Sequence, residues 1–150
     1  MLLLVPRRRW PVVLTATLLA ELAGNFLIGE VAGTAIGSAA SNVVEPVVGA
    51  WIVLRILGGP PVLDRRRHLF VFLGGACAVG PLIGAILGSA STQLTPNHDS
   101  YLSVLGRWFT GDALGVLVVG SLILAWVLLV APYLMMMPGM GMGTSQTSRG

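Results

Sequence analysis

Two acidic side chains, Glu21 and Glu45, stand near the middle of long apolar stretches, and each has an asparagine within about one helical turn. Asn25 follows Glu21 by four residues and Asn42 precedes Glu45 by three, so each pair shares one helix face. An ionised carboxylate at mid-membrane costs at least about 3 kcal/mol, and we expect at least one of the two to be protonated at pH 7. These four side chains form a candidate polar cluster. Two interpretations stay open, a neutral hydrogen-bonded staple between helices or a site that senses a proton or ligand.

The surroundings of this cluster favour a shared depth for the two carboxyls, because the second apolar stretch is expected to run opposite to the first. Pro46 has no N–H to bond the Asn42 carbonyl, which leaves that acceptor free for another partner. The nearest basic residue along the second stretch, Arg55, stands about 15 Å away along a helix.

Other chemistry is not indicated by the sequence. It contains no G-x-S-x-G, H-E-x-x-H, C-x-x-C, Walker A or dinucleotide glycine motif, so we expect no enzyme and no cofactor. Cys77 is the single cysteine, and His98 has no second ligand nearby, which argues against a metal site. The methionines of the C-terminal tail could bind Cu(I) as soft ligands, but low-complexity disorder is the favoured interpretation.

The composition places these residues in a membrane protein. The chain is 55% hydrophobic and 10% charged, with a mean hydropathy of +0.85. Its net charge is +3, but all nine basic residues are arginines that cluster beside apolar segments, so they indicate topology and not nucleic-acid binding. A length of 150 residues allows one domain and leaves no room for a separate catalytic module.

The elements that must position the cluster are four apolar spans, expected at residues 12–28, 32–57, 69–89 and 113–131. They predict an all-α integral membrane protein with the four helices in an antiparallel bundle. A basic N-terminus, 1–11, precedes the 12–133 membrane domain, and a disordered Met/Gly/Ser tail, 134–150, follows it. The N-terminus and the connection between the second and third spans are rich in arginine, and the other two connections hold only Arg107. The positive-inside rule therefore puts both termini in the cytoplasm, as expected for a multi-pass protein of a bacterial inner membrane.

Small residues recur every four positions on two of these spans, a pattern typical of tightly packed membrane helices. The third span also contains Pro81, which should kink it. The residues expected to support packing are Gly33 and Gly37 on the second span and Gly80, Gly84 and Gly88 on the third.

The fourth span is expected to begin at a turn formed by Thr110, Gly111 and Asp112, after an interfacial lead-in over 101–109. Asp112 would then cap the N-terminus of the helix, and Trp108 would lie at headgroup level. Gly111 and Gly115, four residues apart, would let another helix approach closely.

Two separated blocks carry a family resemblance: NVVEPVVGAW from Asn42, which includes Pro46, and WFTGDALGVL from Trp108, which includes Gly111, Asp112 and Gly115. Together they resemble the membrane-associated sensor domains of class one, the MASE family, over roughly residues 10–126. Ser121 stands where that family usually has a proline. The resemblance is to the N-terminal portion only, since complete members have about twice as many helices and a cytoplasmic output domain. This chain would thus be truncated or act in trans.

The resemblance implies a membrane-embedded input domain that signals to a histidine kinase or a diguanylate cyclase. The bilayer and either a second copy of the chain or another signalling protein are its expected partners, and no ligand is predicted. A different class of function is a small transporter or proton-coupled channel subunit with a pathway past Glu21 and Glu45. A third is a purely structural accessory subunit.

Overall fold

The computed structural model describes residues 2–62, 64–94 and 99–130, and within them the regular structure is entirely helical. Among these residues, four helices are long and apolar enough to cross a membrane: Arg7–Leu27, Ala32–Leu57, Arg66–Thr92 and Tyr101–Ala125. The expected all-α class with four spans is therefore confirmed. His98 and the tail from 134 to 150 lie outside the described residues.

The four spans differ in regularity. The first consists mainly of α1 (Trp10–Leu27), and the second is α2 (Ala32–Leu57). The third joins α3 (Arg66–Phe72), the π-helical segment η3 (Leu73–Val79) and α4 (Gly80–Thr92). The fourth joins α5 (Tyr101–Gly115), the π-helical η4 (Val116–Gly120), α6 (Ser121–Ala125) and the π-helical η5 (Trp126–Val130). Two short 3₁₀ turns, η1 (Leu2–Leu4) and η2 (Arg7–Arg9), precede α1.

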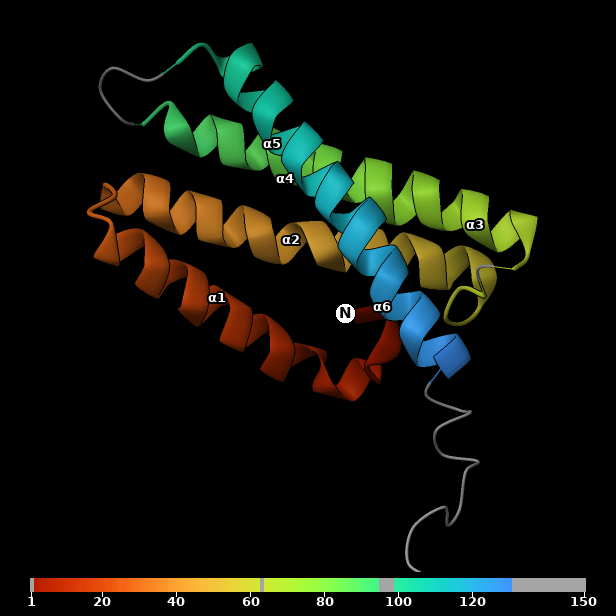
Figure 1. Ribbon diagram of the computed structural model, residues 1–150. Helices are drawn as coiled ribbons and strands as arrows, with labels where there is room; N and C mark the ends of the chain where they lie inside the picture. Colours follow the sequence, from red (N-terminus) through yellow and green to blue (C-terminus); the bar gives the residue numbers. More distant parts are fainter. Residues whose placement is uncertain (1, 63, 95–98, 131–150) are drawn as a thin grey trace, which may run out of the picture.

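Helix α2 lies at the centre of the arrangement, between α1 and α4, and α5 crosses α4 obliquely (Figure 1). Contacts between α2 and the third span run from Gly37 against Ser91 of α4 at one end to Gly49 against Ala76 of η3 at the other. Lipid tails are as apolar as leucine, so close contact of small residues is what holds such helices together. The small residues of α2 and α4 therefore set how closely these two helices pack.

The five glycines expected to support packing all face other parts of the chain. A Cβ atom placed on Gly33 would lie 3.3 Å from a methyl of Leu94, and one on Gly80 would lie 3.1 Å from the carbonyl oxygen of Glu45. A Cβ on Gly37 would overlap Ser91, and one on Gly88 would overlap the indole of Trp108. No described atom lies within 4 Å of a Cβ placed on Gly111 or Gly115, so the close approach expected there comes from none of the described residues.

The third span accommodates Pro81 through its π-helical segment. Proline cannot donate to the carbonyl of the residue four positions earlier, here Cys77. The helix is π-helical over Leu73–Val79, directly before Gly80 and the buried Pro81. A local π-helical stretch is one of the known causes of irregular membrane helices, and it stands here at the position of the expected kink.

The fourth helix starts at Tyr101, before the expected start at residue 113, and this corrects the assignment of Asp112 as a helix cap. The chain stays helical through Thr110, Gly111 and Asp112, and the glycines with positive φ in the described chain are Gly29 and Gly58. A turn within an apolar segment would leave backbone groups unpaired where no water can reach them, which favours the continuous helix. Trp108 consequently packs on Gly88 and is only partly exposed.

The N-terminal residues fold back under one end of the helices. The indole N–H of Trp10 lies 3.2 Å from the carbonyl oxygen of Leu2 and 3.1 Å from that of Val5. Leu2 is only 4% exposed, and Leu3 and Leu4 pack against a cluster of buried side chains that includes Val53 and Phe72. Trp10 thus holds the leucines of η1 against the spans.

Candidate functional site

Glu45 lies at one of the points where α2 and α4 approach each other closely. A Cβ atom placed on Gly84 would lie 2.9 Å from Oε2 and 3.0 Å from Cβ of Glu45. A Cβ atom placed on Gly80 would lie 3.1 Å from the backbone carbonyl oxygen of Glu45. The glutamate side chain therefore fits against α4 only because α4 presents glycines at both positions.

The side chain of Asp112, on α5, approaches the carboxyl group of Glu45. The carboxyl groups of Glu45 and Asp112 lie within hydrogen-bonding reach of each other. The Oδ2 atom of Asp112 is buried, and no donor among the described residues bonds it. Ionised carboxylates only accept hydrogen bonds, so a direct bond between them requires a proton on one. At least one of the two carboxyls is therefore protonated whenever they bond to each other directly.

The remaining members of the expected cluster separate into two groups. Glu21 of α1 lies close enough for its charge to act on Asp112, and Asn42 lies beside Asp112 in an open hollow with Arg107. Asn25 is engaged elsewhere: its amide N–H donates to Ser38 Oγ at 2.9 Å and to the Ala35 carbonyl at 3.3 Å. The structure thus brings Asn42 and the carboxyls of Glu45 and Asp112 together, whereas Asn25 ties α1 to α2.

Asp112 is the member that the polar-cluster argument missed. Its type and its place at the expected start of an apolar run predict a helix cap instead. A signal was nevertheless present in the sequence, because Glu45 and Asp112 stand in the two blocks, NVVEPVVGAW and WFTGDALGVL, that share one family resemblance. Two distant blocks that belong to one pattern are candidates for contact in space.

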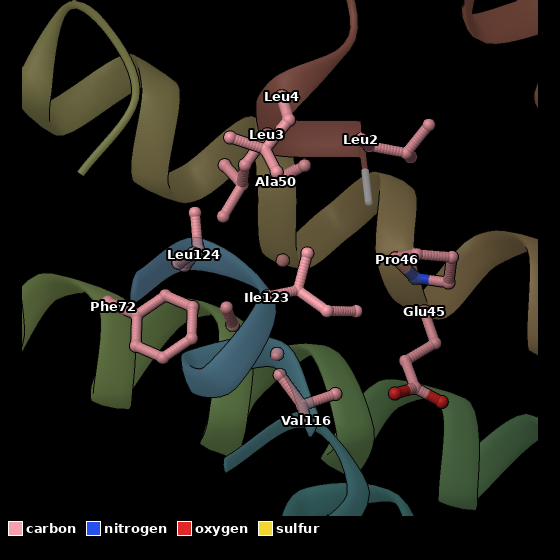
Figure 2. Close-up of a pocket in the computed structure, with 13 residues that line it drawn as sticks. Leu2, Leu3, Leu4, Glu45, Pro46, Ala50, Phe72, Val116, Ile123 and Leu124 are labelled. Carbon is pink, nitrogen blue, oxygen red and sulfur yellow. The ribbon is translucent and has the colours of Figure 1, made fainter. Parts of the chain in front are cut away.

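Next to Glu45 lies a cavity of about 100 Å³ that is otherwise apolar (Figure 2). Leu2, Leu3 and Leu4 close one side of it, and Figure 2 shows Glu45 across the cavity from Phe72. The rest of the wall comes from α2, η3, η4 and α6. Glu45 therefore supplies the only polar side chain among the described residues that line this cavity.

The carboxyl pair stands between this inner cavity and a second, more open hollow. Glu45 lines the apolar cavity, whereas Asp112 lines the hollow with Asn42, Arg107, Trp108 and Gly111. A change in the protonation or charge of the pair would thus alter the electrostatic surroundings in both the cavity and the hollow. In the described ranges, no group of three or more His, Cys, Asp or Glu side chains is arranged to hold a metal ion.

In a comparison with protein families, the MASE1 model matches residues 1–138. Neither a curated protein nor a solved structure matches the chain.

Proposed function

This chain belongs to the MASE1 family of membrane sensor domains of signalling proteins, and on that premise we propose that it passes a stimulus to a cytoplasmic output partner. It is a multi-pass membrane protein with a sensor domain, and signal transduction fits the family. The partner we propose is of the histidine kinase or diguanylate cyclase type, and the membrane is the bacterial inner membrane. We assign no catalytic step to the chain itself.

The Glu45–Asp112 pair is the observation that carries this proposal. It brings α5 next to α2 at a point where α4 presents Gly84, so three helices meet at this pair of carboxyls. Packed interiors transmit strain, because they contain few voids into which a side chain can relax. A ligand or proton that changes the pair would therefore shift α2, α4 and α5 relative to one another, and that shift is the proposed signal.

The orientation that we propose is an antiparallel bundle with both termini in the cytoplasm, which the distribution of arginines supports. An output partner would then meet the cytoplasmic ends of the helices. Helix α5 also leaves a smooth strip at Gly111 and Gly115, since Cβ atoms on these two glycines would have no described neighbour within 4 Å. This strip suits close packing against a second copy of the chain or a helix of the signalling partner.

The direct test is to identify the partner and then perturb the pair. Proximity labelling from a biotin ligase fused to the C-terminus should mark a histidine kinase or a diguanylate cyclase in the native membrane. The activity of that enzyme should change when the chain carries Glu45→Gln and should stay unchanged with Gly24→Ala, whose Cβ would have no described neighbour within 4 Å. Labelling of transport proteins alone, or equal output from both variants, would contradict the proposal.

A second candidate function is favoured by the position of the pair between two hollows. A carboxyl pair with access from both sides could carry protons, as in a small transporter or proton-coupled channel subunit. Purified chain in liposomes that contain a pH-sensitive dye separates the two ideas. A sensor should move no protons, whereas a proton pathway should give a flux that Glu45→Gln abolishes.

A further inference from the structure

The apolar cavity beside Glu45 has the features of a ligand site. Its volume of about 100 Å³ is smaller than the roughly 150 Å³ cavity that admits benzene in an engineered protein, so it suits an unbranched chain of about three to five carbons. Two of the segments that form its wall, η3 and η4, are π-helical, and π-helical turns occur frequently at functional sites.

Glu45 supplies the polar side chain of this cavity, and its carboxyl oxygens can accept hydrogen bonds. Asp112, which lines the neighbouring hollow, lies within hydrogen-bonding reach of that carboxyl. Pro46, which lines the cavity, leaves the Asn42 carbonyl without its usual helical donor. A ligand that satisfies this end must therefore bring hydrogen-bond donors, and a primary ammonium group brings three and a positive charge.

The charges around the pair favour the same ligand. Glu21 of α1 adds a second acidic group near Asp112. The sequence from Leu73 to Thr92, which forms the facing helix, contains no charged residue, and Cys77 is its one titratable group. Arg107 lines the outer hollow with Asp112, but its guanidinium is paired with Asp99. The described residues thus provide no cation at the cavity end of the pair.

From this cavity and its acceptor-lined end we infer that the chain binds a short primary alkylamine, with the ammonium on Glu45 and the alkyl chain among the apolar side chains. The η1 leucines, held by Trp10, cover the chain of the bound amine on one side. The ammonium pairs with the ionised form of the Glu45 carboxyl, which an adjacent positive charge favours. The binding of the amine does not depend on the proposed function. Only the next step, in which an occupied cavity produces a signal, rests on it.

The test uses n-butylammonium and the purified full chain in phosphatidylcholine nanodiscs, which lack the anionic lipids that would attract amines to the surface. Calorimetry at pH 7 should show saturable binding at one site. Hydrogen bonds that involve a charged group are stronger than those between neutral groups. 1-Butanol should therefore bind about tenfold more weakly than n-butylammonium. Butyrate, with the same chain and the opposite charge, should not bind.

Two variants locate the site, and a third serves as a control. Glu45→Gln keeps the shape of the side chain and should weaken butylammonium binding about tenfold. Gly120→Ala narrows the cavity without a clash, since its Cβ would lie 3.5 Å from Val116 and 3.8 Å from Phe72, and should also weaken binding. Gly24→Ala should leave binding unchanged. If Glu45→Gln does not fold, Gly120→Ala still decides the matter.

Equal affinity for 1-butanol and butylammonium would overturn the inference, as would unchanged binding to Gly120→Ala. Native mass spectrometry that finds a lipid acyl chain retained in place of the amine would also overturn it. These results leave the proposed function intact, because the partner-labelling experiment uses no amine. Conversely, the absence of a signalling partner would refute the sensor function without affecting the binding measurement.

Discussion

Replacement of Gly84 by leucine tests the contact on which the carboxyl pair depends. A Cβ atom at this position would meet Oε2 of Glu45 at 2.9 Å and its Cβ at 3.0 Å. The carboxyl oxygen belongs to the flexible end of the side chain and can move aside. The Cβ of Glu45 is attached directly to the α2 backbone, so relief of the second contact requires the helix itself to move.

The cost of this movement follows from what surrounds it. Gly80, one turn earlier on α4, already holds the backbone of Glu45 closely, so α2 cannot retreat at Gly84 without loosening that contact too. Over-packing of a well-packed interior costs typically about 1–3 kcal/mol. We expect Gly84→Leu to lie in this range, and Gly84→Ala to lie near its lower end because only one methyl group is added.

Unfolding of the purified protein in mixed detergent micelles, followed by circular dichroism, measures this cost. Two control variants should stay close to the wild type: Gly24→Ala, whose Cβ has no described neighbour, and Leu82→Phe, at a side chain that is 42% exposed. If Gly84→Leu unfolded at the same denaturant concentration as the wild type, close packing of α4 on Glu45 would be refuted.

Three further predictions follow from the same structure. Reporter fusions after positions 67 and 145 should report cytoplasm and those after 29 and 97 the outer side; a cytoplasmic signal at 97 would contradict four spans. Infrared spectra in membranes at neutral pH should contain a protonated-carboxyl band that weakens in Glu45→Gln and in Asp112→Asn; a missing band would exclude a proton on the pair. Trp10→Phe should lose about 1 kcal/mol and speed thiol labelling of Leu4→Cys in a Cys77→Ser background, whereas unchanged labelling would show that Trp10 does not hold η1.

The chain sequence is enough to predict the spans, because the cost of burying charge and unpaired backbone in lipid acts on each segment separately. Long apolar runs gave the four helices, and Gly58, with a φ of 75°, ends α2 where Gly-Gly-Pro-Pro predicts an end. The start of the fourth helix was misplaced for a related reason. Thr110, Gly111 and Asp112 have turn-like types, but tertiary surroundings without water favour continued helix over a turn.

Side-chain spacing also identified which residues share a face. The four-residue repeat of small residues in the third span predicted one packed face, and Gly84 and Gly88 indeed contact Glu45 and Trp108. Spacing could not say which helix would fill that face. The indole of Trp108 lies on Gly88, and this brings α5 next to α4 with Asp112 turned toward Glu45.

The sequence by itself thus determined that carboxyls would be buried in the spans and that Glu45 would need a polar partner. Only the tertiary structure decided that the partner is Asp112, with Glu21 nearby and Asn25 bound to Ser38. The physical reason is that hydropathy and periodicity are properties of one helix at a time. How each helix is rotated about its own axis, and against which neighbour, depends on the fit of side chains into the gaps left by glycines, since in lipid no hydrophobic difference between neighbours favours one choice.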